Sequence, residues 1–257
     1  MSTTSDYTPA AFLSITSLRP SEIPSEDTII EEGRKLIESS STWKAGKTFF
    51  NVVKTSYRPK GPTDGAPWYC RYSVHKPSEI TFDQLWDKLS HNKAENELQF
   101  IHEIQKVNQV KELSPKAKIW TLYYTFTPPV SARVFTELQV VELTTVATHG
   151  TASADGANGA TAANGAKALR VGYIVSLPID LTGQGDEELA LLEEKGVKGR
   201  YVSVERVLEL ENGETEWRMA TSSTPGGSIP NFIVESTMAK KISSDVPQFL
   251  KWFETKK

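Results

Sequence analysis

The order of helical and strand-like segments is the feature of this sequence that most constrains its fold. From residue 108 to residue 223, segments rich in Val, Ile, Thr and aromatic residues follow one another with no helical segment between them. A doubly wound parallel sheet needs a helix between successive strands, so this order excludes it. The order instead predicts an α+β fold on a strongly curved antiparallel sheet, with strands at 108–113, 116–126, 133–146, 168–179, 200–210 and 214–223.

Further elements flank this run of strands. Apolar residues recur at spacings of three and four in several segments, which is typical of amphipathic helices, and Ser25 is a suitable N-cap for the first of them. Two more strand-like segments lie on either side of a turn region rich in Pro and Gly, and we expect them to pair as a hairpin. The predicted helices are 25–39, 81–89, 93–107 and 228–255, and the predicted hairpin joins 47–57 to 67–75.

The long C-terminal helix is the element that can cover the concave face of such a sheet. In an arbitrary protein, apolar stripes at these spacings fill a solid core. A long helix does not collapse completely onto a curved sheet, which favours an internal cavity lined by alternate residues of each strand. The residues predicted to line or adjoin it are Trp120, Tyr124, Tyr173, Val204, Arg206 and Glu137 from the strands, and Ile229, Phe232 and Ile233 from the helix.

Arg206 is the exception in its apolar set, because a buried guanidinium needs a partner. One interpretation is a structural ion pair with an inward carboxylate such as Glu137; the other is that Arg206 binds a ligand's carboxylate or phosphate. Arg133, Arg71 and His75 are weaker candidates for the same role, and the face that carries the last two can equally meet solvent.

One segment differs sharply in composition from the rest. Residues 147–168 consist mostly of Ala, Gly, Thr and Asn and include no aromatic or large aliphatic residue, so we expect a flexible insertion between two strands. A domain boundary here would leave neither half with a sufficient set of strands. We therefore divide the chain into an N-terminal extension with an amphipathic helix, 1–44, and one ligand-binding domain, 45–257.

Charge and targeting signals limit the partners. The chain has 257 residues and a formal net charge of −3, which argues against a nucleic-acid-binding protein. No secretory signal, membrane-spanning run or lipidation motif is visible, so any membrane contact is expected to be transient and peripheral. Cys70 is the single cysteine, which fits a reducing cytoplasm and a buried, inert thiol. We expect the protein to be a monomer.

Two stretches resemble the START lipid-transfer domain family. The first is 82–136, with Leu85-Trp86, a helix and then VNQVKELSPKAKIWTLYYTFTPPVSARVF; the second is 198–223 followed by STPGGSIPNFIVES. The family's aspartate before Pro-Gly-Gly is Thr224 here, and its Arg-Asp-Phe is Arg133-Val134-Phe135. The resemblance covers roughly residues 45 to 255 and is closest to uncharacterised START-like proteins of fungi.

This resemblance implies a helix-grip fold that binds, and transfers, a lipid, a sterol or another hydrophobic molecule. The alternative is a cyclase- or hydrolase-like enzyme acting on a polyketide-like substrate in the same cavity, because such enzymes share the fold, with Tyr124, Tyr173, His75 or Arg206 as acid or orienting groups. A third interpretation is a protein-interaction module that uses the acidic loop 180–195.

Recognisable catalytic, cofactor and metal motifs are not evident. Gly46-Lys47-Thr48 lacks the first glycine of a phosphate-binding loop, and Gly183-Gln184-Gly185 lacks a third glycine and runs into acidic residues. The four histidines show no metal-ligand spacing. We therefore expect no cofactor, no metal and no catalytic residue.

A closed cavity needs a moving part. The candidates are 127–132, 180–198 and the junction 224–230, whose Pro225-Gly226-Gly227 suits a hinge. Ser243-Ser244-Asp245 before Pro247 resembles a new helix start and predicts a break in the terminal helix near Ile242.

Overall fold

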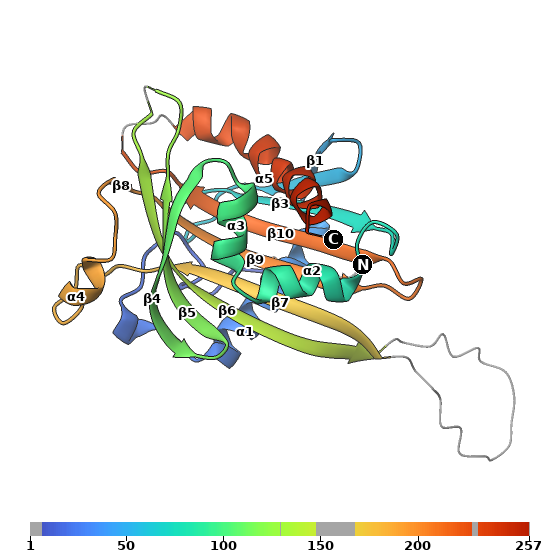
Figure 1. Ribbon diagram of the computed structural model, residues 1–257, viewed down its shortest axis with the longest axis horizontal. Coiled ribbons are helices and arrows are strands. Elements are labelled where there is room, and N and C mark those ends of the chain that lie inside the picture. The colour runs from blue at the N-terminus through green and yellow to red at the C-terminus, as the bar shows by residue number, and fades with distance from the viewer. Residues whose placement is uncertain (1–6, 129, 148–167, 228–230, 257) are drawn as a thin grey trace, which may run out of the picture.

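A single antiparallel sheet forms the centre of the computed structural model, which describes residues 7–128, 130–147, 168–227 and 231–256 (Figure 1). The strands follow the order β1-β2-β3-β10-β9-β7-β6-β5-β4, and β8 pairs in parallel with β6. The strands are β1 (Lys44–Phe49), β2 (Val53–Arg58), β3 (Trp68–His75), β4 (Ile104–Ser114), β5 (Ala117–Tyr124), β6 (Arg133–Ala147), β7 (Ala168–Pro178), β8 (Val197–Lys198), β9 (Arg200–Glu209) and β10 (Thr215–Thr224).

Helices lie on both faces of this sheet. The face that carries α5, α2 and α3 is called the α5 face below, and the opposite one, covered by α1, the α1 face (Figure 1). The helices are α1 (Glu26–Ser39), α2 (Phe82–Ser90), α3 (Lys93–Phe100), α4 (Glu187–Ala190) and α5 (Asn231–Glu254), with short 3-10 turns at Pro20–Glu22 and Ser40–Thr42. The predicted α+β fold with a large antiparallel sheet and a C-terminal helix is confirmed.

The first predicted hairpin is more finely divided than expected. Phe50 and Asn51 adopt positive φ angles of 51° and 62°, so the chain turns there and the single strand expected at 47–57 is two strands, β1 and β2. The second of these pairs with β3 as predicted. The helix expected at 93–107 ends at Phe100, and β4 begins at Ile104.

The terminal helix continues where the sequence predicted a break. α5 runs through Ile242 and contains Pro247 in its interior, so the prediction of two hinged helices is wrong. Val246 and Phe249, on either side of the proline, are buried against the α5 face. Tertiary packing thus holds the helix across a residue that lacks a backbone donor.

α1 is bound tightly to the sheet. Its N-cap is Ser25, whose side chain accepts a hydrogen bond from the backbone N–H of Thr28, as the sequence suggests. Ile29, Gly33, Leu36 and Ile37 are buried in a row along the helix. The packing is close, because a Cβ atom on Gly33 would lie 2.6 Å from Cγ2 of Val175 on β7.

The residues before α1 pack against the sheet. Leu13 is buried in the core on the α1 face, and Leu18 forms a parallel bridge with Ile179 just after β7. β6 and β7 are strands, as predicted for the flanks of the insertion, and they pair up to Ala147 and Ala168. Residues 148–167, on which the prediction of flexibility falls, lie outside the described residues.

Among the described residues, no helix combines the length and the apolar character needed to cross a membrane.

Candidate functional site

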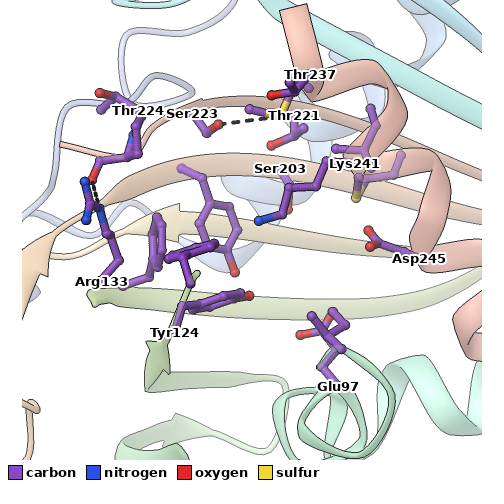
Figure 2. A pocket seen from close by; sticks show the side chains of 18 of the residues that line it. Glu97, Tyr124, Arg133, Ser203, Thr221, Ser223, Thr224, Thr237, Lys241 and Asp245 are labelled. Atoms are coloured by element: carbon purple, nitrogen blue, oxygen red, sulfur yellow. Dashed lines mark hydrogen bonds between the residues drawn. The ribbon is translucent and has the colours of Figure 1, made fainter. Parts of the chain in front are cut away.

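A cavity of about 370 Å³ lies between the α5 face of the sheet and the helices α3 and α5 (Figure 2). Its lining combines apolar and aromatic walls with charged groups at separate places. The lining residues are Lys93, Glu97, Ile101, Tyr124, Phe126, Val130, Arg133, Phe135, Tyr201, Ser203, Glu205, Met219, Thr221, Ser223, Thr224, Pro225, Thr237, Met238, Lys241, Ile242 and Asp245.

One wall consists of packed aromatic rings from neighbouring strands. The ring centroid of Phe135 lies 5.2 Å from that of Tyr124 and 5.6 Å from that of Tyr201. Tyr124 also stacks on Phe126, at 6.2 Å. Such an aromatic surface is suited to the apolar part of a small molecule.

Charged side chains gather at the end of the cavity that we call the acidic end, formed by Glu97, Glu205 and Asp245 with Lys93. Lys93 forms an ion pair with Glu97 one turn along α3, and its Nζ lies 3.1 Å from Oε1 of Glu205 on β9. Glu205 also accepts a hydrogen bond of 2.9 Å from Nε1 of Trp217. Burial alone would raise the pKa of Glu205, but Lys93 and Arg71 hold it below its ordinary value, so Glu205 is ionised.

Two carboxyl groups near this end have strongly raised pKa values. Burial, partly offset by Arg71, raises the pKa of Asp245 on α5 to about 7. Burial, partly offset by Lys93, also raises the pKa of Glu137 on β6 to about 7. Oε1 of Glu137 accepts a hydrogen bond of 2.7 Å from Nε2 of Gln139. Both groups therefore titrate near neutral pH.

The opposite end of the cavity, which we call the junction end, is formed by Arg133, Thr224 and Pro225 (Figure 2). Nε of the buried Arg133 donates a hydrogen bond of 3.2 Å to the backbone oxygen of Pro225. A second guanidinium nitrogen donates to the backbone oxygen of Ser131, before β6. Arg133 thus connects two of the candidate gates predicted from the sequence, 127–132 and 224–230.

A further contact crosses the rim between α5 and the loop after β5. Nζ of Lys241 lies 4.5 Å from the centroid of the Phe126 ring, a cation–π geometry, and 4.0 Å from Oε1 of Glu103. Thr237 and Lys241 are exposed, so this side of the cavity faces solvent.

Three residues predicted on strands lie on the cavity side of the sheet. Tyr124 lines the cavity. Trp120 lies on the same face of β5 but packs in a separate cluster with Ala94, Ile104 and Leu122. Glu137 pairs across the sheet with Trp120 and is buried on this face.

The prediction of which side chains of β7 and β9 face the cavity is wrong. Tyr173 and Val204 belong to the core on the α1 face and do not line the cavity. The side chains of β9 that do so are Tyr201, Ser203 and Glu205. The error has a physical cause: both faces of these strands are covered by helices, and the more apolar set packs into the solid core under α1.

Arg206 also lies on the α1 face. Its Nη2 atom lies 2.5 Å from Oε1 of Glu216, which also binds Arg218 at 3.0 Å. The guanidinium is therefore part of a structural ion pair, but with Glu216 and not with Glu137. Arg206 does not line the cavity, so the prediction that it binds a ligand there is wrong.

The remaining predicted residues fall into two groups. Ile229 lies outside the described residues, and Phe232 and Ile233 belong to α5 but their side chains lie outside the description.

Arg71 and His75 are buried on the α5 face, so that face does not meet solvent as suggested. The Arg71 guanidinium stacks 4.2 Å above the Trp217 ring, and Nε2 of His75 lies 2.8 Å from Oγ of Ser73.

The acidic end was not predicted from the sequence, although two of its features are visible there. Lys93 and Glu97 are four residues apart on one helix, a spacing that signals an ion pair. Glu205 stands in the middle of an apolar strand, which is the same signal that singled out Arg206. Asp245 was interpreted as part of a helix start. In the described part of the chain, no group of three or more His, Cys, Asp or Glu side chains is placed to hold a metal ion.

A known protein family matches most of this chain. A family model described as "Protein of unknown function (DUF3074)" matches residues 68–253, which is most of the chain. The chain belongs to this family. No curated protein matches this DUF3074 protein.

Solved structures resemble the DUF3074 protein over nearly its whole length. Human STARD10 superposes with a TM-score of 0.65 at 11% identity, covering 94% of this chain and 83% of that one. Human StAR-related lipid transfer protein 5 gives 0.64 at 12% identity, with 90% and 95% covered. A fragment of the STAR-related lipid transfer protein from Xanthomonas axonopodis gives 0.55 at 13%, with 82% and 98% covered. The predicted START-like fold is confirmed.

Proposed function

We propose that this protein binds a hydrophobic ligand in the cavity under α5 and carries it between membranes. The observation that supports this most is the cavity itself, which has a largely apolar and aromatic lining beneath a long helix. The START-like fold supports the same proposal, since two of the similar proteins named above, the human and the Xanthomonas axonopodis ones, are described as StAR-related lipid transfer proteins.

The size of the cavity favours a small ligand. Its volume of about 370 Å³ lies near the lower end of the range of small-molecule sites, which is roughly 300–1,000 Å³. A single acyl chain or a compact ring system fits this volume better than a lipid with two long chains. We therefore propose a single-chain amphiphile or a sterol-like molecule as the ligand.

Native mass spectrometry of the purified protein tests binding directly. We expect a copurified hydrophobic molecule, or uptake of one from vesicles of phosphatidylcholine doped with fluorescent single-chain and sterol probes. Transfer is tested by moving the same probes between donor and acceptor vesicles, and membrane contact should be transient.

A cavity-filling variant provides the critical comparison. Ser203 is a small residue facing the cavity, and Ser203→Trp should reduce probe uptake strongly while leaving the protein folded. The matched control is Thr144→Trp on the exposed part of β6, which should take up the probes as the wild type does. Equal uptake by both variants would refute binding in this cavity.

The enzyme alternative rests on Asp245, a cavity-lining carboxyl group whose pKa of about 7 suits acid–base chemistry. Tyr124 lines the cavity too, and burial raises the pKa of its hydroxyl well above the ordinary value, so it acts as a neutral donor. Recovery of a copurified ligand chemically unchanged after prolonged incubation would argue against turnover.

Oligomeric state, compartment and origin remain predictions from the sequence. We propose a monomer, which size-exclusion chromatography with light scattering tests. A cytoplasmic location agrees with the single buried cysteine, and the fungal origin rests on the sequence resemblance alone.

A further inference from the structure

The acidic end of the cavity contains more carboxyl groups than cations. Arg71 and Lys93 are the basic side chains that act on Asp245, and both also face Glu205, at 3.8 Å and 3.1 Å. Lys93 additionally pairs with Glu97. The two cations are thus already engaged by Glu97 and Glu205, which leaves Asp245 and Glu137 without a cation of their own.

Asp245 is the group that a ligand can reach. It lines the cavity from α5, and Figure 2 shows its carboxyl group pointing toward the interior, above Glu97. Within the part of the chain that the structure describes, no hydrogen bond or ion pair reaches this carboxyl group. A half-buried carboxylate without a partner is unfavourable, and a ligand that supplies a positive charge would relieve that cost.

The surroundings suit a head group at this end and a tail toward the other. Ser203 and Tyr124 contribute hydroxyl groups to the lining, and Phe135, Tyr201 and Met238 contribute aromatic and apolar surface. Aromatic faces next to buried carboxylates also favour a cation.

We propose that the cavity selects an amphiphile with a protonated amine as its head group, bound by Asp245, and disfavours anionic lipids. This inference rests on the proposed binding function and specifies its ligand class. Deprotonation of Asp245 strengthens amine binding, because the ionised carboxylate attracts the positively charged ammonium group of the ligand. The groups facing Asp245 that share this electrostatic environment are Arg71 on β3, Lys93 and Glu97 on α3, Tyr124 on β5 and Glu205 on β9. Lys241, one turn earlier on α5, also lines the cavity, with its Nζ over the Phe126 ring and 4.0 Å from Glu103.

Three probes with one tail and different heads test the proposal: dodecylamine, dodecanol and dodecanoate, titrated by calorimetry below their aggregation concentrations. We expect dodecylamine to bind at least about tenfold more tightly than dodecanoate near pH 8, a factor that one favourable charge contact supplies. The preference should shrink near pH 6, below the raised pKa of Asp245.

The variant Asp245→Asn removes the charge and keeps the shape. It should lower amine affinity by about tenfold and leave dodecanol affinity nearly unchanged. The matched control, Asp87→Asn, alters an exposed carboxylate on α2 and should bind all three probes as the wild type does.

The outcomes separate the two proposals. Equal binding of the three probes, or tighter binding of dodecanoate, would overturn the amine preference while the binding function stands. If no probe binds and no ligand copurifies, both proposals fail. An amine preference that persists in Asp245→Asn would also overturn the assignment to Asp245.

Discussion

The Nε atom of Arg133 donates a hydrogen bond of 3.2 Å to the backbone oxygen of Pro225, which joins the start of β6 to the junction before α5. The same guanidinium bonds to the backbone oxygen of Ser131. Gly226 and Gly227, which come directly after Pro225, have φ angles of 65° that glycine adopts readily. The contact with Arg133 therefore fixes a backbone segment of high conformational freedom at one end of the cavity. Arg133 is therefore the residue that we expect to control ligand exchange.

Replacing Arg133 with Met should speed ligand release by about tenfold or more, since hydrogen bonds from a charged group contribute about 1.5–3 kcal/mol. Stopped-flow release of a fluorescent probe measures this, and hydrogen exchange at Gly226 and Gly227 should become faster. The exposed Arg19→Met is the control. An unchanged release rate in a folded Arg133→Met variant would exclude Arg133 as a latch.

The two faces of β9 should respond differently to the same charge. Val204→Asp buries an unpaired carboxylate under α1 and should unfold the protein or cost about 3 kcal/mol or more. Ser203→Asp faces the cavity and should retain the fold while weakening the uptake of uncharged probes such as dodecanol. Thermal melts and probe binding measured on both variants check the register. A stable Val204→Asp variant would contradict it.

Glu137 should make stability depend on pH. Its folded-state pKa of about 7 lies above the ordinary value of 4.5, so the stability it contributes is fully present below about pH 4.5 and lost as pH rises through about 7. Glu137→Gln should therefore raise the melting temperature by a few degrees near pH 8, and less near pH 5.

Exposed Glu95→Gln is the control for that series and should melt as the wild type does at both pH values. A Glu137→Gln variant that melts lower than the wild type near pH 8 would show that the carboxylate is stabilising there.

Gly33 tests how closely α1 packs on the sheet. In an exposed helix, Gly→Ala stabilises by about 1 kcal/mol. Here the new Cβ atom would lie 2.6 Å from Val175, so we expect Gly33→Ala to destabilise by about 1–3 kcal/mol. Chemical denaturation measures the change, and Val175→Ala in the same chain should recover part of it. Stabilisation by Gly33→Ala alone would mean that α1 moves freely away from β7.

The sequence predicted the class of fold because the succession of elements and the long terminal helix are visible in it. It did not predict which face of β9 meets the cavity. Val202 and Val204 form the more apolar set, and apolarity would place that set toward the cavity only if a single face of the sheet were covered. The N-terminal helix covers the other face, and the cavity receives Ser203 and Glu205.

The acidic end depends on side chains from segments far apart in the chain. Lys93, Glu205 and Asp245 come from α3, β9 and α5, and no spacing within one element brings them together. Likewise, Ser243-Ser244-Asp245 has the local signature of a helix start, and burial of Val246 and Phe249 overrides it. Local patterns identify elements, whereas these features depend on contacts between elements.

The alternation of β9 has an evolutionary consequence. Val202 and Val204 hold the sheet to α1, while Ser203 and Glu205, their immediate neighbours, face the cavity. A substitution at Ser203 alters the shape and charge offered to a ligand and leaves the two valines packed under α1 in place. Under the function proposed above, proteins of the DUF3074 family could differ in their ligands through such cavity-facing positions, while Val202 and Val204 keep the packing that stabilises the fold.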